Sequence, residues 1–147
     1  MFLLELFKRL LIAFDGSNYS VKALEYACRL AKALGSSVRL VMVIDTARVH
    51  VLLYDIMVIK DEEVRERAEK IVKKTLENIR VEYPGIDISY SIRKGHPVEE
   101  IIREINEWKP DLLILGPKGT TDLKEVELGS VAETLIERVP IPVLVVK

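Results

Sequence analysis

Continuous apolar runs punctuate this chain and limit the folds that it can adopt. Two of them, residues 10–14 and 38–44, are each followed along the chain by a segment with helical spacing of apolar residues. Two more, residues 111–115 and 142–146, lie towards the C-terminus. A strand that is apolar throughout is typical of a parallel sheet covered by helices on both faces. These runs therefore predict an α/β fold with a buried sheet.

Helical patterns fill the intervals between the runs. Helices are expected at about residues 17–34, 61–82, 97–108 and 130–139. Apolar residues alternate over 86–92, which predicts a strand with one exposed face, nearer a sheet edge. The order βαβαβαβαβ predicts a single domain, 1–147, with a five-stranded parallel doubly wound (Rossmann-like) sandwich and helices on both faces. Its ligand crevice should lie at the carboxyl ends of the strands, where the winding reverses.

Each expected helix has an apolar stripe that should face the sheet. The stripes comprise Val21, Leu24, Ala27, Ala31 and Leu34 in the first helix, Val64, Ala68, Ile71, Thr75 and Ile79 in the second, and Ile101, Ile102, Ile105 and Trp108 in the third. Cys28 falls on the buried side of the first helix, where a cysteine is expected to be inert core.

A loop with three glycines follows the apolar run at 111–115. Gly116, Gly119, Gly129 and Ser130 form the pattern G-x-x-G-x₉-G-[ST]. Glycines let backbone N–H groups approach phosphate oxygens closely, and a helix N-terminus offers unpaired N–H groups and a positive dipole end. Ser130 and Glu133 also match an S-x-x-E capping box, which would begin the following helix at this point. The loop therefore predicts a site for a phosphate-bearing ligand.

The composition excludes several other classes of protein. The formal net charge is −1, from 22 basic and 23 acidic residues that are interleaved, which argues against nucleic-acid binding. A single cysteine allows no internal disulfide and fits a reducing cytosol. The apolar N-terminus lacks the pattern of a secretory signal and is too short to span a bilayer, so a cytoplasmic location is expected. The absence of glutamine and the many Glu and Lys residues are thermophile-like.

Two segments do not fit a simple doubly wound scheme. An apolar N-terminal extension covers residues 1–8, and an apolar insertion covers residues 46–60 after the second strand. Apolar surface of this kind usually marks a contact. The two segments are expected to cover each other or the sheet edge, to form a subunit interface, or to act as a lid over the ligand.

Four places in the chain, taken together, carry a family resemblance. They are residues 13–17 (AFDGS), 41–45 (VMVID), the glycine loop over 116–130, and residues 140–146 (PIPVLVV). In this order and at this domain length, the chain resembles the universal stress protein family, in its ATP-binding branch, from residue 8 to residue 147. The resemblance implies ATP as ligand, or ADP or AMP, with Mg²⁺ or Mn²⁺ held mainly by the phosphates. It also implies a homodimer through the last strand, Val143 to Val146.

The resemblance also assigns site residues. In the ATP-binding members the glycine motif wraps the ribose and phosphates, Asp15 corresponds to a residue near the adenosine, and Val43 corresponds to one whose backbone meets the adenine edge. The cofactor-binding set implied is Ala13, Phe14, Asp15, Val43, Gly116, Lys118, Gly119, Gly129, Ser130 and Val131; no catalytic residue and no protein metal ligand is expected. A carboxylate at Asp15 can accept from a ribose hydroxyl or the adenine amine, or it can cap the helix that starts near Ser17.

Some residues leave alternatives open. Pro117 stands where relatives usually have a small residue, and it has no N–H to donate. Lys118 can meet a phosphate or be an ordinary surface lysine. His96 can border the crevice or be a turn residue, and His50 is expected to pack rather than react.

The glycine loop lacks the G-K-[ST] of a phosphoryl-transfer loop, and no nucleophile elbow or metal-spaced His/Cys cluster is present in the sequence. Three functions remain. The first is an adenine-nucleotide-binding stress-response or regulatory protein that acts by nucleotide-dependent conformational or association changes. The second is a slow Mg-dependent ATPase. The third is a nucleotide-free homodimeric interaction module, which Pro117 makes conceivable.

Overall fold

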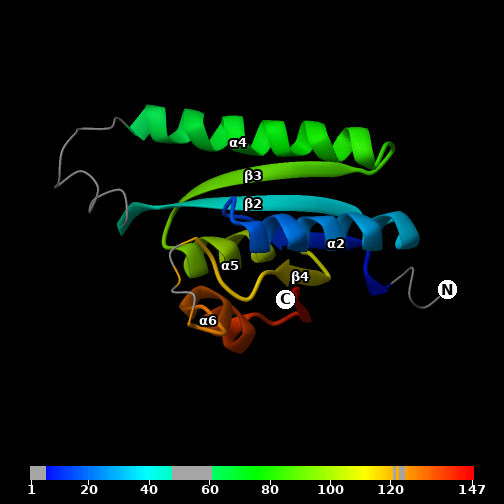
Figure 1. The fold of residues 1–147 in the computed structure, drawn as a ribbon. Coiled ribbons are helices and arrows are strands. Elements are labelled where there is room, and N and C mark those ends of the chain that lie inside the picture. The colour runs from blue at the N-terminus through cyan, green and yellow to red at the C-terminus, as the bar shows by residue number, and fades with distance from the viewer. Residues whose placement is uncertain (1–5, 48–60, 121, 123–124) are drawn as a thin grey trace.

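The computed structural model describes residues 6–47, 61–120, 122 and 125–147 (Figure 1). Its helices and strands are β1 (Arg9–Ala13), α2 (Asn18–Leu34), β2 (Ser37–Asp45), α4 (Asp61–Glu82), β3 (Ile88–Gly95), α5 (Pro97–Trp108), β4 (Leu112–Leu115), α6 (Ser130–Arg138) and β5 (Val143–Val145). Nearly every boundary of these elements lies within two residues of the boundary that the apolar pattern predicts. The apolar segments expected at 1–8 and 46–60, with His50, fall mostly outside the described residues.

The five strands form one parallel sheet in the order β3-β2-β1-β4-β5. β1 lies in the centre, where Leu10 pairs with Val38 of β2 on one side and with Leu112 of β4 on the other. The winding therefore reverses between β1 and β4. The predicted five-stranded doubly wound fold is confirmed, and β3 is an edge strand as its alternating pattern predicts.

Two apolar cores lie on opposite faces of this sheet. Leu10 and Ile12 point to the core shared with α2 and α4, whereas Leu11 points to the core shared with α5 and α6. This division follows from the alternation of side chains along a strand. Figure 1 shows α4 above β2 and β3, and α5 and α6 below them. Among the described residues, no helix has the length and apolar content to cross a membrane.

The apolar stripes of α2 and α4 are rotated slightly from those expected. Val21 and Ile71 are exposed, so their expected inward positions are wrong. The buried stripe of α4 instead includes Val72 and Leu76, both almost completely covered. Where two apolar residues are adjacent in a helix, as Ile71 and Val72 are, only one can point at the sheet. Periodicity alone does not decide which of the two it is.

A network of ion pairs links α5 to β2 and β3, and the carboxylate at its centre is buried. Glu104 is only 2% exposed and accepts hydrogen bonds from Arg39 Nη1 at 3.1 Å and from Arg93 Nε at 2.6 Å. Arg93 also pairs with Glu100 at 3.4 Å and with Glu107. Carboxylates are rarely buried unless they are paired in this way. Nothing in the apolar pattern of the sequence indicates this network.

Trp108, the only tryptophan of the chain, closes α5 at the end of the molecule where the strands begin. Two guanidinium carbons lie over its ring: that of Arg39 at 4.7 Å and that of Arg9 at 5.8 Å from the ring centroid. Arg9 also donates from Nη1 to the Trp108 carbonyl oxygen at 2.6 Å. These contacts fasten the end of α5 to the start of β1.

Candidate functional site

A cavity of about 160 Å³ lies at the carboxyl ends of β1, β2 and β4, beside the start of α6. This is the place where the winding reverses and where doubly wound folds bind their ligands. Nine of the ten predicted cofactor-binding residues line the cavity: Ala13, Phe14, Asp15, Val43, Gly116, Lys118, Gly119, Ser130 and Val131. The tenth, Gly129, lies next to it, and its N–H donates to the carbonyl oxygen of Pro117 at 2.7 Å.

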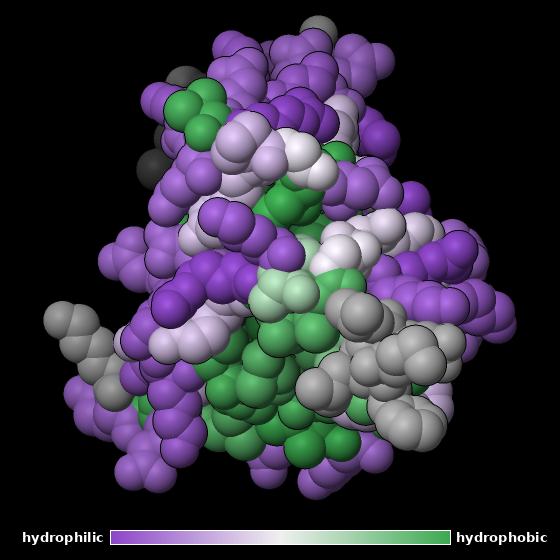
Figure 2. All heavy atoms as spheres, turned by 90° about the vertical axis from the view of Figure 1, so that its right-hand side faces the viewer, coloured by the Kyte–Doolittle hydropathy of each residue, from purple (hydrophilic) through white to green (hydrophobic). Residues whose placement is uncertain are grey.

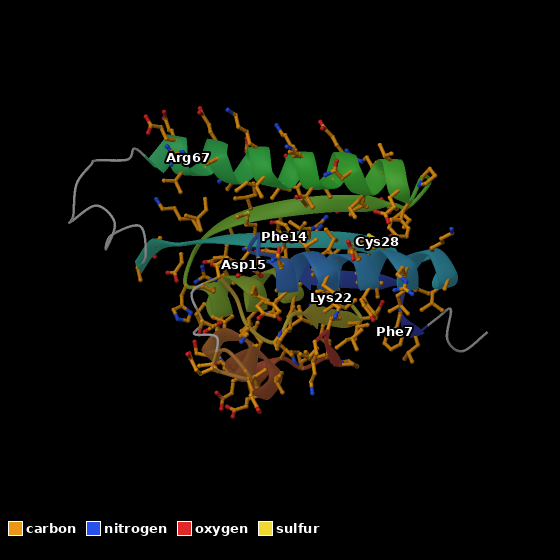
Figure 3. The ribbon with its side chains drawn as sticks, viewed as in Figure 1. Phe7, Phe14, Asp15, Lys22, Cys28 and Arg67 are labelled. Carbon is orange, nitrogen blue, oxygen red and sulfur yellow. The ribbon has the colours of Figure 1, made fainter. Side chains whose placement is uncertain are left out.

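Asp15 joins the end of β1 to the glycine loop. Its Oδ1 accepts from the Ser17 N–H at 2.9 Å, and its Oδ2 accepts from the Thr120 N–H at 3.0 Å. Ser17, rather than Asp15, is the N-cap of α2, since its side chain accepts from the Ser20 N–H. The alternative role of Asp15 as the cap of this helix is therefore wrong. Figure 3 shows Asp15 beside Phe14, at the strand end.

The glycine loop packs closely against its surroundings. A Cβ on Gly116 would lie 2.7 Å from the Cβ of Tyr19 and 3.1 Å from its backbone carbon, so the backbone of the loop approaches α2 more closely than any side chain would allow. Gly119 donates its N–H to Asp122 Oδ2 at 2.7 Å, and Asp122 donates its own N–H back to the Gly119 carbonyl oxygen at 3.3 Å. The loop thus turns on itself beside the cavity.

The start of α6 differs from the predicted capping box. Gly129 is the N-cap, with φ −71° and ψ 158°, and no side chain caps the helix. Ser130 is already the first helical residue, so its predicted role as the cap is wrong, and the Gly129 carbonyl oxygen accepts the first helical bond from the Glu133 N–H at 2.9 Å. The N–H groups of the first turn have no partner within a helix. Because Ser130 and Val131 line the cavity, this end of α6 presents such groups to a ligand.

Lys118 lines the cavity but is tied to the loop. Its Nζ donates to the Val126 carbonyl oxygen at 2.9 Å and lies 5.4 Å from the centroid of the Tyr19 ring. A contact between this ammonium group and a phosphate stays a prediction. Pro117 is buried, and its carbonyl oxygen accepts a hydrogen bond from the Gly129 N–H within the loop.

The lining of the cavity is acidic. Asp15, Asp45 and Asp122 contribute three carboxylates, against the single ammonium group of Lys118. Asp45 ends β2, and its Oδ1 accepts from the Ala47 N–H at 3.0 Å. Among the residues that the structure describes, no three His, Cys, Asp or Glu side chains are arranged to hold a metal ion.

Several lining residues were not predicted as site residues. Beyond Asp45 and Asp122, these are Ser20, Val41, Pro97, Ile101, Leu115, Ala132 and Leu135. The apolar ones belong to strands and helices that the sequence marks only as core, so no signal separates them from other core positions. Asp45 and Asp122 do carry a signal, because one follows an apolar strand directly and the other lies inside the glycine loop. His96 is the N-cap of α5 and is not among the described residues that line the cavity.

Cys28 lies away from this cavity, on the buried face of α2 (Figure 3). It is a free thiol, and no part of it is exposed. Burial, with smaller contributions from the nearby Glu82 and Glu25 carboxylates, raises the pKa of the thiol to about 12. The prediction of a buried cysteine in the core is confirmed, and the thiolate form that reacts with electrophiles is suppressed.

The fold and the cavity define an α/β protein with a binding crevice above the central strands of a parallel sheet. The chain matches the profile of the universal stress protein family over residues 6–147, and it belongs to that family. The predicted family resemblance is confirmed.

Individual relatives share most of their length with the chain. Universal stress protein MJ0531 of Methanocaldococcus jannaschii is 32% identical over 143 residues, which cover 97% of this chain and 83% of the relative. The solved structure of MJ0577, from the same organism, is 30% identical, with a TM-score of 0.78 over 97% of this chain and 96% of that one. A universal stress protein of Archaeoglobus fulgidus, solved in complex with dAMP, is 20% identical, with a TM-score of 0.69 over 97% and 99% of the two chains; this likeness is one of fold.

Proposed function

We propose that the protein binds an adenine nucleotide, ATP or else ADP or AMP, in the cavity at the carboxyl ends of the strands. The bound nucleotide then controls a conformational or association change in a stress response. The observation that carries this proposal is the convergence of Asp15, Val43, the glycine loop and the start of α6 on one cavity. Each supplies a different kind of contact to the same ligand.

The contacts divide by the chemistry of the nucleotide. The Asp15 carboxylate is an acceptor for a ribose hydroxyl or the adenine amine. The apolar lining at Val43 and Ile101 suits the faces of a purine ring, and backbone groups of β2 suit its polar edge. The N–H groups of the first turn of α6 suit phosphate oxygens. This arrangement favours adenosine at the β1–β2 side and phosphates at the α6 side.

A divalent cation fits the charge of this cavity. The lining has three carboxylates and one ammonium group, and a triphosphate adds several negative charges to them. Mg²⁺ or Mn²⁺ carried in by the phosphates would lower the repulsion, since such ions are commonly bound through substrate phosphates and only one or two carboxylates. Asp15, Asp45 and Asp122 are the lining carboxylates whose charge it would offset.

The A. fulgidus relative binds dAMP, which is also an adenine nucleotide. That relative shares the fold at 20% identity, so it makes an adenine ligand plausible for the fold and assigns none to this chain. The proposal therefore relies on the residues of the cavity, and a direct binding measurement decides it.

Thermal unfolding with and without millimolar Mg-ATP tests the proposal. A ligand that binds only the folded state at a hundred times its Kd stabilises that state by about 2.7 kcal/mol. We expect a clear rise in Tm for the wild type that is lost in Gly129→Val, whose added side chain meets the Asp122 carboxylate. Ala33→Val is the matched control. It adds comparable bulk at an exposed position of α2, about 20 Å along the helix from Ser20 at 1.5 Å per residue.

Two results would contradict the proposal. The first is an unchanged Tm of the wild type with Mg-ATP, Mg-ADP and AMP, together with no nucleotide released from the denatured protein. That outcome favours the nucleotide-free interaction module. The second is an equal shift in Gly129→Val, which would place the nucleotide elsewhere.

We also propose a homodimer through the last strand. β5 is an edge strand, with Leu144 38% exposed, and an uncovered apolar edge invites pairing with a second copy. Figure 2 shows further apolar surface gathered on the end of the molecule where the strands begin. Light scattering at micromolar concentration should give twice the mass of one chain, and Leu144→Lys should return the mass to that of a monomer. A wild-type monomer at this concentration overturns the proposal.

A further inference from the structure

The carboxylate of Asp122 contacts two of the glycines of the glycine loop. It lies between Gly119 and Gly129, two of the three glycines of the motif, and it lines the cavity. Its Oδ2 accepts from the Gly119 N–H at 2.7 Å. A Cβ on Gly129 would lie 2.8 Å from its carboxylate carbon and 3.1 Å from its Oδ1. The carboxylate thus rests directly against the N-cap of α6.

The carboxylate of Asp15 also contacts the loop beside Gly119. Asp15 Oδ2 accepts from the Thr120 N–H at 3.0 Å, and a Cβ on Gly119 would overlap this oxygen. Two consecutive backbone N–H groups of the loop therefore donate to carboxylates of the protein itself. These are the groups that a glycine loop usually offers to phosphate oxygens.

We propose that the Asp122 carboxylate is a built-in occupant of the phosphate subsite and sets the specificity of the site for nucleotide charge. This inference rests on the nucleotide proposal above. A carboxylate resembles a phosphate in being an anion whose oxygens accept from backbone N–H groups at a helix N-terminus. A phosphate that enters between Gly119 and Gly129 must move this carboxylate away or share the position with it.

The consequence is a preference that depends on the phosphates of the ligand. Adenosine does not reach the Gly119–Gly129 side and is indifferent to Asp122. Metal-free ATP meets the carboxylate at close range, where like charges repel strongly. A divalent cation bound to the phosphates removes much of that penalty, so Mg²⁺ should improve ATP binding more in the wild type than in a protein without the carboxylate.

Isothermal titration with adenosine, AMP and ATP in EDTA tests the inference. Asp122→Asn keeps the shape of the side chain and removes its charge, and Asp122→Ala removes the group altogether. Glu127→Gln is the matched control, because it removes the same charge from an exposed position of the same loop. We expect both Asp122 variants to bind metal-free ATP at least tenfold more tightly than the wild type. The Kd of adenosine should stay within about twofold, and the control should match the wild type for all three ligands.

The outcomes separate this inference from the nucleotide proposal. If adenosine and AMP bind and the ratio of the ATP and adenosine Kd values is the same in Asp122→Asn, Asp122→Ala and the wild type, the inference is overturned and the nucleotide proposal stands. An equal gain from Glu127→Gln also overturns it, since the effect would then be one of net charge. If no adenine compound binds any variant, both proposals fail. ATP binding that appears only in the Asp122 variants supports both.

Discussion

The buried carboxylate of Glu104 allows a quantitative prediction about stability. Glu104→Gln preserves the shape of the side chain but leaves the guanidinium groups of Arg39 and Arg93 without their shared counter-ion. Breaking a buried ion pair by removing one partner costs about 3–5 kcal/mol. The arginine side chains are 29% and 16% exposed, so water compensates part of the loss, and about 2–4 kcal/mol is the expected destabilisation. At about 2–4 °C for each kcal/mol in a chain of this length, Tm should fall by roughly 5–15 °C.

The pH dependence of the same variant tests the cause of the loss. Burial alone would raise the pKa of Glu104, but hydrogen bonds from Arg93, Arg39 and Ser91 outweigh it and hold the pKa below its usual range. A carboxyl whose pKa is lower in the folded state stabilises the protein above its unfolded pKa, about 4.3, and this stabilisation is lost as the pH falls through the folded pKa. The gap in unfolding free energy between the wild type and Glu104→Gln should therefore narrow below about pH 4.

Urea denaturation followed by circular dichroism, at pH 7 and at steps down to pH 3, measures both effects. Glu107→Gln is the control, since its carboxylate also pairs with Arg93 but its side chain is 66% exposed. The free energy of unfolding of Glu107→Gln should lie less than about 1 kcal/mol below that of the wild type. The reasoning is refuted if Glu104→Gln lies within 1 kcal/mol of the wild type at pH 7, or if the gap between the two is unchanged in acid.

Two further predictions follow from packing. Gly116→Ala should destabilise the fold by about 1–3 kcal/mol, because its Cβ would lie 3.1 Å from the backbone carbon of Tyr19 and part of the backbone would have to shift. Gly129→Ala meets only the side-chain carboxylate of Asp122 and should cost less in the same denaturation experiment. An equal cost for the two variants would contradict the argument. Cys28 should react with a thiol reagent only at the rate of unfolding, since burial raises its pKa to about 12. Rapid labelling in native buffer, with no change when denaturant is added, would show that the thiol is accessible.

The succession of strands and helices along the chain could be predicted from the sequence, because the apolar runs are uninterrupted and the helical patterns lie between them. The doubly wound sheet and the crevice at the strand ends follow from that succession, and the edge position of β3 follows from the apolar alternation within the strand. The rotation of α2 and α4 about their axes could not be predicted from the sequence. Ile71 and its neighbour Val72 both fit the helical period, and only packing on the sheet buries Val72. In α2 the polar Ser20, and not the adjacent Val21, is the buried residue.

The candidate site shows the same division. The glycine loop and Asp15 were predicted because their spacing and position at a strand end carry information within a short stretch of sequence. Outside the site, Glu104 was missed because its partners Arg39 and Arg93 lie on other elements, and a carboxylate on a helix ordinarily indicates an exposed face. Asp122 lies inside the glycine loop but was not singled out, because its contact with Gly119 depends on a turn that the sequence does not show.

The position of Trp108 has a practical consequence. Two guanidinium groups lie over its indole at the end of the sheet where the strands begin, and the cavity lies at the end where they finish. Since the chain has no other tryptophan, intrinsic fluorescence comes from one chromophore remote from the crevice. Its emission should change when the protein unfolds and stay constant when the crevice fills. Optical titrations can therefore follow folding without interference from a ligand, and occupancy of the crevice calls for a different reporter.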